Sequence, residues 1–264
     1  IKIYYHIGLP KTATSFIQYN LKLNSNMGLY DYYPKIMKIN GSRLKTRTVI
    51  MSDEKYIPLF GETPYGSNKI KNKIRDLYLL NKMYKCYIII YLRRQDKLIN
   101  SIYKQISKEN NKIVPRFNTF IKEKCFYFGY DELLNSLKQY FKGNIIVDYY
   151  DYLENKIISS KDFFINFWQK IFWNKLPRLV DENYRNISLN SNDSIKINEL
   201  KKKGLNTQYI RKIFEIKQSN FKDTDSFINE ELKKIILEFY FDSNKKIFNS
   251  DNIFLNKYYL DEIK

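Results

Sequence analysis

The chain has 264 residues, of which 44% are hydrophobic, and this is enough to bury a sizeable core. Because α/β domains of this length are common, we expect one domain over residues 1–264. The net charge of +18 favours an anionic partner, but the lysines are spread along the whole chain, which argues against nucleic-acid binding. Two cysteines without paired spacing and a single histidine argue against a zinc site and fit a reducing, cytoplasmic setting.

The longest apolar run, residues 87–92, is far too short to cross a bilayer. We therefore expect no transmembrane segment and no signal sequence, while contact with a membrane surface stays open. The oligomeric state is not determined by any pattern in the chain.

Strands and helices alternate along the first part of the chain. The run at 86–92 is apolar throughout, which is typical of a strand buried on both faces of a parallel sheet. This order predicts a three-layer α/β/α fold with a central parallel sheet and a helical C-terminal half. The expected strands are 3–7, 48–51, 86–92 and 144–149, and the expected helices are 13–23, 70–83, 130–141 and one after Asp96, which we expect to cap it.

From residue 152 onward the pattern is mostly helical, with helices expected over 161–172, 194–203, 208–217 and 229–241. The basic run Lys201–Gly204 predicts a solvated helix end closed by a glycine cap. Five aromatic residues at helical spacing predict a core face rather than a ligand site: Phe163, Phe164, Phe167, Trp168 and Phe172.

The segment Gly8–Ser15 follows the first strand and opens the first helix. Helix N-terminal N–H groups and the helix dipole favour an anion there, and the ammonium group of Lys11 adds positive charge. The segment therefore predicts a site for a phosphate-bearing ligand. It departs from the magnesium-dependent G-x-x-x-x-G-K-[ST] loop, because Lys11 comes three residues after Gly8 and no glycine directly precedes it.

Residues 6–18 resemble the 5'-phosphosulfate loop of sulfotransferases, which use 3'-phosphoadenosine 5'-phosphosulfate (PAPS) as donor. Residues 91–105 resemble the 3'-phosphate site of the same family, in which an arginine at a strand end and a serine on the next helix bind the 3'-phosphate. Arg93 and Ser101 stand at those positions. A weaker likeness extends over 130–152 and 186–189. The resemblance implies a P-loop-like sulfotransferase fold of the bacterial carbohydrate type.

The same resemblance implies the residue roles. Lys11 would stabilise the leaving oxygen, and no metal is required. Many members have glycine at position 13, and alanine suits that position if it is helical. The carboxylate-base members make Glu54 the first choice and Asp53 the second for the base that activates an acceptor hydroxyl. The implied donor-binding residues are Lys11, Thr12, Ala13, Thr14, Ser15, Arg93 and Ser101.

The acceptor implied in this way is a carbohydrate or another hydroxyl compound. Two alternatives from other classes stay open. A small-molecule kinase with a degenerate P-loop would need magnesium, and a non-catalytic module would bind acidic polymers through its basic surface with strong salt dependence.

Overall fold

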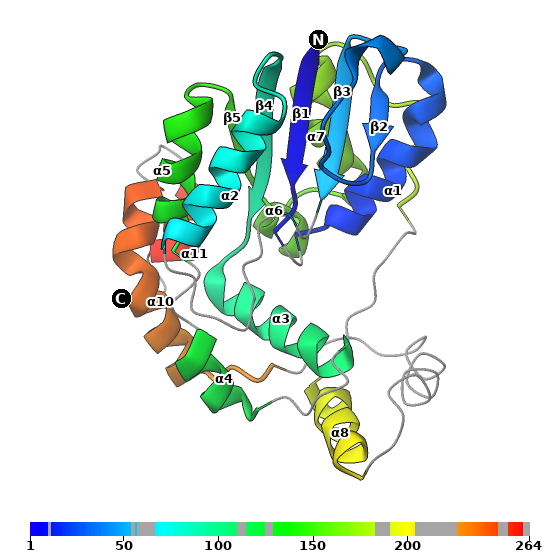
Figure 1. Cartoon of the computed structure of the whole chain (residues 1–264). Helices are drawn as coiled ribbons and strands as arrows, with labels where there is room; N and C mark the ends of the chain where they lie inside the picture. Colours follow the sequence, from blue (N-terminus) through cyan, green and yellow to red (C-terminus); the bar gives the residue numbers. More distant parts are fainter. Residues whose placement is uncertain are drawn as a thin grey trace. The chain divides into compact units, whose positions relative to one another are not determined.

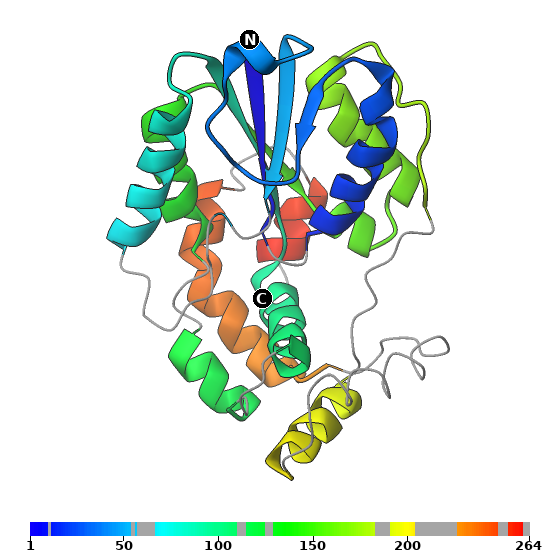
Figure 2. The same ribbon diagram turned by 45° about the vertical axis from the view of Figure 1, so that its right-hand side comes forward.

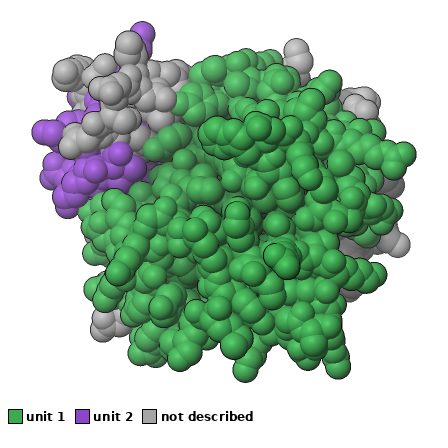
Figure 3. Space-filling model, turned by 90° about the horizontal axis from the view of Figure 1, so that it is seen from above, with its two compact units in different colours: residues 1–93, 131–186 green, residues 94–130, 187–264 purple. Residues whose placement is uncertain are grey.

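The computed structural model describes residues 1–9, 12–53, 56, 67–109, 115–124, 129–182, 191–203, 226–247 and 253–260. The chain divides into two compact units (Figure 3). Unit 1 comprises residues 1–93 and 131–186, and unit 2 comprises residues 94–130 and 187–264. A single domain over 1–264 stays a prediction.

Unit 1 is built on a parallel five-stranded sheet with the strand order β2-β3-β1-β4-β5 (Figure 1). The α/β fold with a central parallel sheet is therefore confirmed. β2 was not predicted, because it is only three residues long and reads as a turn before Pro34. The strands are β1 (Lys2–Ile7), β2 (Asp31–Tyr33), β3 (Thr48–Asp53), β4 (Lys85–Leu92) and β5 (Ile145–Tyr149).

Helices of unit 1 cover both faces of this sheet (Figure 2). α1 (Thr14–Asn24) and α7 (Ser160–Phe172) lie on one face, and α2 (Ser67–Leu80) and α5 (Tyr130–Phe141) lie on the other. The short 3-10 helices η1 (Ser25–Met27) and η2 (Gly41–Arg43) and the helix α6 (Asp151–Glu154) complete the described elements of the unit. The three-layer arrangement predicted from the alternation is thus present in unit 1.

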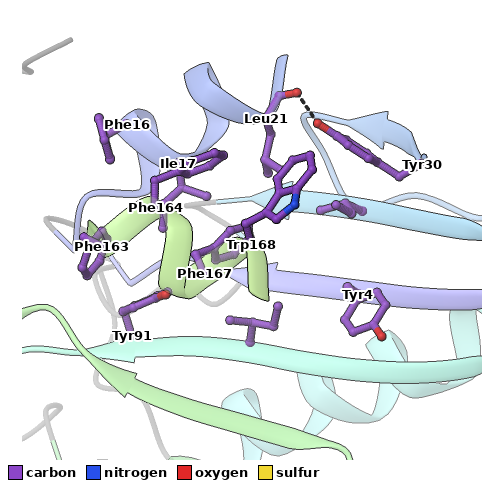
Figure 4. Packing of buried hydrophobic residues seen from close by; sticks show 12 residues of the cluster. Tyr4, Phe16, Ile17, Leu21, Tyr30, Tyr91, Phe163, Phe164, Phe167 and Trp168 are labelled. Carbon is purple, nitrogen blue, oxygen red and sulfur yellow. Dashed lines mark hydrogen bonds between the residues drawn. The ribbon is translucent and has the colours of Figure 1, made fainter. Parts of the chain in front are cut away.

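The aromatic run of α7 forms the core between that helix, α1 and the sheet (Figure 4). Phe163, Phe164, Phe167 and Trp168 are each at most 1% exposed, as the helical spacing predicted. The hydroxyl of Tyr30 donates to the carbonyl of Leu21 beside this cluster. Burial of such large side chains contributes about 2 to 3 kcal/mol each, so α7 is held to the sheet mainly by this face.

The described part of unit 2 is helical. The helical character predicted for the C-terminal half is therefore confirmed for its described residues in this unit. α3 (Gln95–Glu109) packs against α4 (Phe117–Lys124), α8 (Ser191–Lys202) and α10 (Glu230–Ile247), and α10 packs against α11 (Ile253–Leu260). α4 and α11 were not predicted. The helix expected over 208–217 lies outside the described residues.

Lys201 corrects the expectation of a fully solvated basic helix end. Its side chain is buried, and its Nζ donates to the carbonyl of Ser107 at 2.7 Å. Lys202 and Lys203 are exposed as expected, and Gly204 lies outside the described residues. A buried ammonium group needs such a partner because desolvation without one is costly.

Candidate functional site

The candidate residues that follow β1 and β3 lie at the carboxyl edge of the sheet in unit 1. The chain leaves β1 toward β2 and β3 on one side, and it returns through α2 to β4 on the other side of β1. The end of β1 is therefore a topological switch point, where ligands of open α/β sheets bind. Ile7 pairs in register with Asp53 of β3, so the turn after β1 and the end of β3 lie side by side.

The turn between β1 and α1 is tightly closed. Gly8 donates its N–H to the carbonyl of Asp53 at 3.3 Å, and Thr12 Oγ1 donates to the carbonyl of Leu9 at 2.7 Å. A Cβ atom on Gly8 would lie 2.1 Å from Thr14 Oγ1, so glycine is required for this close approach. Lys11, which the sequence places in this turn, lies outside the described residues.

The N-terminus of α1 has the features of an anion site. The N-cap residue Ala13 makes no side-chain hydrogen bond, and the first turn contains no acidic residue. N–H groups in the first turn of an α-helix have no partner within the helix, and the helix dipole is positive there. Thr14 is 2% exposed, and its Oγ1 has no hydrogen-bond partner among the described residues. An oxyanion at this position would satisfy these donors.

Ala13 corrects the expectation of a helical alanine. It lies before the first helical residue with φ 58° and ψ 20°, in the left-handed region. That conformation costs a residue with a Cβ atom about 1 to 2 kcal/mol and costs glycine almost nothing. The structure thus gives a physical reason for glycine at this position.

We expect Ala13→Gly to leave the free energy of unfolding unchanged or to raise it by up to about 1 kcal/mol, because relief of backbone strain offsets the greater unfolded-state entropy of glycine. Lys71→Gly, at an exposed position inside α2, is the matched control and should cost about 1 kcal/mol. Urea denaturation measures both. An equal loss in the two variants would contradict the left-handed assignment.

The end of β3 is tied to both β1 and α1. His6 Nδ1 lies 2.8 Å from Ser52 Oγ, and Gln18 Nε2 donates to the carbonyl of Ser52 at 2.9 Å. Asp53, the last residue of β3, accepts the N–H of Ile36 at 3.4 Å through Oδ2. These contacts place the Asp53 backbone beside the β1–α1 turn. The first-choice base, Glu54, follows directly and lies outside the described residues.

His6 is a structural residue of the core. It is fully buried, and the rings of Tyr91 and Phe167 meet it edge to face. Burial lowers the pKa of His6 to about 3, so the imidazole is neutral at physiological pH. Its Nδ1 is at hydrogen-bond distance from Ser52, and together with the two ring contacts this gives His6 a structural role.

Arg93 follows β4 at the same edge of unit 1. Its Nε donates to Glu154 Oε2 at 2.9 Å, and its Nη2 donates to Glu154 Oε1 at 2.5 Å. The guanidinium lies 5.0 Å from the centroid of the Tyr150 ring. Burial acts to lower the pKa of Arg93, but the charge of Glu154 and its hydrogen bonds raise it overall, so the side chain is firmly cationic. The arginine is thus held in one orientation by a bidentate pair.

Glu154 and Tyr150 were missed from the sequence. They follow β5, the neighbour of β4, and Glu154 is separated from Arg93 by 61 residues. No motif marks them. An acidic residue within a few positions of the end of an adjacent parallel strand was the available signal, since the carboxyl ends of such strands share one edge.

Asp96 does not cap α3 as expected. α3 begins at Gln95, so Asp96 lies inside its first turn, where its carboxylate accepts Arg94 Nε at 2.7 Å and Nη2 at 2.9 Å. Arg94 also donates to the carbonyl of Tyr258 at 3.1 Å. The two consecutive arginines therefore have separate carboxylate partners, each within its own unit.

Ser101 lies on α3 in unit 2 and is 8% exposed. Arg93 belongs to unit 1, so a shared 3'-phosphate site of Arg93 and Ser101 stays a prediction. Residues 186–189, which carried the weaker likeness, lie outside the described residues.

Neither a metal site nor a membrane-spanning helix is found over the described ranges. No group of three or more His, Cys, Asp or Glu side chains there is arranged to hold a metal ion. Within the same ranges, no helix has the length and apolar character that crossing a membrane requires.

No family model matches the sequence, and no curated protein matches it. Among solved structures, the chain is similar to the crystal structure of mouse sulfotransferase SULT7A1 complexed with PAP, with 10% identity and a TM-score of 0.49. That similarity covers 97% of this chain and 89% of the mouse chain.

Proposed function

We propose that this protein is a sulfotransferase that moves a sulfuryl group from PAPS to a hydroxyl group of an acceptor. The β1–α1 turn carries the proposal. Its helix N-terminus has no acidic residue in the first turn, and the buried Thr14 hydroxyl has no partner among the described residues. The turn lies at the switch point of a parallel sheet, where a phosphosulfate group would be bound by N–H groups and hydroxyls.

Each end of the donor has its own residues in this proposal. The N–H groups of residues 12–15 and the hydroxyls of Thr14 and Ser15, together with Lys11, bind the 5'-phosphosulfate. Arg93 and Ser101 bind the 3'-phosphate, with the guanidinium oriented by Glu154. Because these groups supply positive charge and hydrogen bonds, the site needs no metal ion for binding.

The donor carries a sulfuryl group bonded to an oxygen of its 5'-phosphate, and this phosphate is the leaving group. A carboxylate, Glu54 or in second place Asp53, accepts the proton of the acceptor hydroxyl as the new S–O bond forms. Lys11 stabilises the phosphate oxygen when the old S–O bond breaks, so that the products are a sulfate ester, 3'-phosphoadenosine 5'-phosphate (PAP) and a proton. Such charge stabilisation by fixed donors is the main source of catalysis in loose group transfers.

The proposed acceptor is a carbohydrate, because the motif set and the carboxylate base resemble those of glycan-modifying sulfotransferases. The proposed location is cytoplasmic.

Thermal unfolding with added nucleotides tests the proposal. PAP at about 100 times its dissociation constant should stabilise the protein by about 2.7 kcal/mol in EDTA, a shift of roughly 5 °C. Lys11→Ala should lose this shift. Glu54→Gln should keep it but lose sulfuryl transfer from radiolabelled PAPS to a panel of glycans.

Other outcomes identify the alternatives. Stabilisation by ATP only with magnesium would favour the kinase, and salt-dependent heparin binding without any nucleotide effect would favour the polyanion-binding module. A Lys11→Ala variant with the full PAP shift would remove the β1–α1 turn from the donor site.

A further inference from the structure

The chain that follows α7, residues 173–182, runs alongside α1 in unit 1 (Figure 2). Asn24 Oδ1 accepts the N–H of Arg178 at 2.8 Å and of Leu179 at 3.1 Å, while its Nδ2 donates to the carbonyl of Leu179 at 2.7 Å. Asn20 makes the same type of pair with the backbone of Asp181, at 2.8 and 3.3 Å. Two buried asparagines of α1 thus bind this backbone from the inner side.

This attachment leaves large apolar side chains in solvent. Trp173 is 81% exposed, Leu176 is 63% exposed and Leu179 is 54% exposed. Two exposed basic residues, Lys175 and Arg178, stand between them, and neither has an ion-pair partner among the described residues. We call these five residues the post-α7 surface. Three large apolar side chains in seven residues, interleaved with cations, differ from isolated exposed hydrophobic residues, which are common.

Trp173 has an unfavourable backbone conformation as well as an exposed ring. It follows the last residue of α7 with φ 27° and ψ −71°, where a bulky residue costs about 1 to 3 kcal/mol. No aromatic ring stacks on it within the described part of the chain. Trp168, inside α7, is fully buried, so the two tryptophans of the protein differ sharply in exposure. Trp173 therefore combines an unfavourable backbone conformation with a ring that lies mostly in solvent.

We propose that the post-α7 surface docks on an anionic lipid membrane. Tryptophan is favoured at the membrane interface, where its ring is half in contact with apolar chains, and the two leucines add apolar area. Lys175 and Arg178 complement anionic headgroups, with each cation contributing about 1 kcal/mol near such a surface. The net charge of +18 adds long-range attraction.

The position of this surface in unit 1 suits attachment. It adjoins the C-terminal ends of α1 and α7, at the amino edge of the sheet, whereas the β1–α1 turn lies at the carboxyl edge. Docking would therefore leave the turn accessible. The proposal does not depend on the proposed sulfotransferase activity.

Vesicle binding tests the proposal directly. We expect the protein to sediment with vesicles of phosphatidylcholine and phosphatidylglycerol at 70:30 and to bind pure phosphatidylcholine vesicles weakly. Trp173→Gly should reduce the bound fraction at least five-fold. Urea denaturation should show that this variant is at least as stable as the parent, because no buried contact is lost and glycine tolerates positive φ.

Two matched controls distinguish binding through this surface from binding caused by the net charge or by any exposed apolar side chain. Lys175→Glu with Arg178→Glu should abolish binding, whereas Lys71→Glu with Arg75→Glu, which changes the net charge equally at two exposed positions of α2, should reduce it less than two-fold. Phe239→Ser, which removes a 54% exposed ring on α10, should leave binding unchanged.

Several results would overturn the proposal. They are no binding of the parent protein to anionic vesicles, full binding of Trp173→Gly, or equal losses from the two charge reversals. In a further such outcome, the parent protein forms a dimer, fails to bind vesicles and loses the dimer on Trp173→Gly substitution. That result would assign the surface to contact with a second copy of the chain.

Discussion

Replacing Arg93 with alanine is expected to weaken PAP binding about 10- to 100-fold, because hydrogen bonds to a charged phosphate contribute about 1.5 to 3 kcal/mol. Affinity for adenosine 5'-phosphate, which lacks the 3'-phosphate, should stay within a few fold. The variant should also lose about 3 kcal/mol of stability, because Glu154 then keeps a poorly solvated carboxylate without its partner. Calorimetric titration with both nucleotides measures the affinity ratio.

Glu154→Gln separates a binding role of Arg93 from a purely structural one. Glutamine removes the negative charge that competes with phosphate for the guanidinium, so PAP should bind as tightly as to the parent protein or more tightly. Arg94→Ala is the matched control, because this neighbouring arginine is paired with Asp96, and its loss should leave the preference for PAP over adenosine 5'-phosphate unchanged. An unchanged preference in Arg93→Ala would refute its assignment to the 3'-phosphate.

Acidification from pH 7 to pH 5 is expected to lower the free energy of unfolding by about 2 kcal/mol through His6 alone. The pKa of His6 is about 3 in the folded protein, because burial disfavours the charged ring, and about 6.5 in the unfolded chain. Between these values the unfolded state binds one proton more than the folded state. Stability is therefore fully present above pH 6.5 and falls by about 1.4 kcal/mol per pH unit below it, until pH nears 3.

His6 is the only histidine of the chain, so this pH window is unusually clear. Carboxyl groups contribute mainly below pH 5, since their ordinary pKa values are about 4. Urea denaturation of His6→Asn should show a flat stability between pH 7 and pH 5, whatever its absolute stability. The same slope in His6→Asn as in the parent would rule out His6 as its origin.

Particular elements show how far the sequence predicts the structure. β1 and β4 were predicted to within one residue. The first shows alternating apolar residues, and the second shows the continuous apolar run of a strand buried on both faces. α5 was predicted with its observed ends, since its apolar residues recur at helical spacing and Gly143 follows it. β2 escaped prediction because three residues carry too little periodicity.

Some features of the candidate site were likewise predictable from the sequence, and others were not. The β1–α1 turn was identified from local residues, because a strand, a glycine and hydroxyl residues at a helix start lie together in the chain. The left-handed conformation of Ala13 was not, because the end of a helix is uncertain by one or two residues from pattern alone. The bidentate pair of Arg93 with Glu154 and the bond of His6 to Ser52 have no local signature at all.

By itself the sequence determined the alternation of strands and helices, the tight turn after β1 and the strongly basic charge. The tertiary structure alone decided which side chains became partners and which apolar residues stayed in solvent after α7. The physical reason is that periodicity and turn residues report burial and backbone geometry over a few neighbouring residues. Contacts across 46 or 61 residues depend instead on strand order and register.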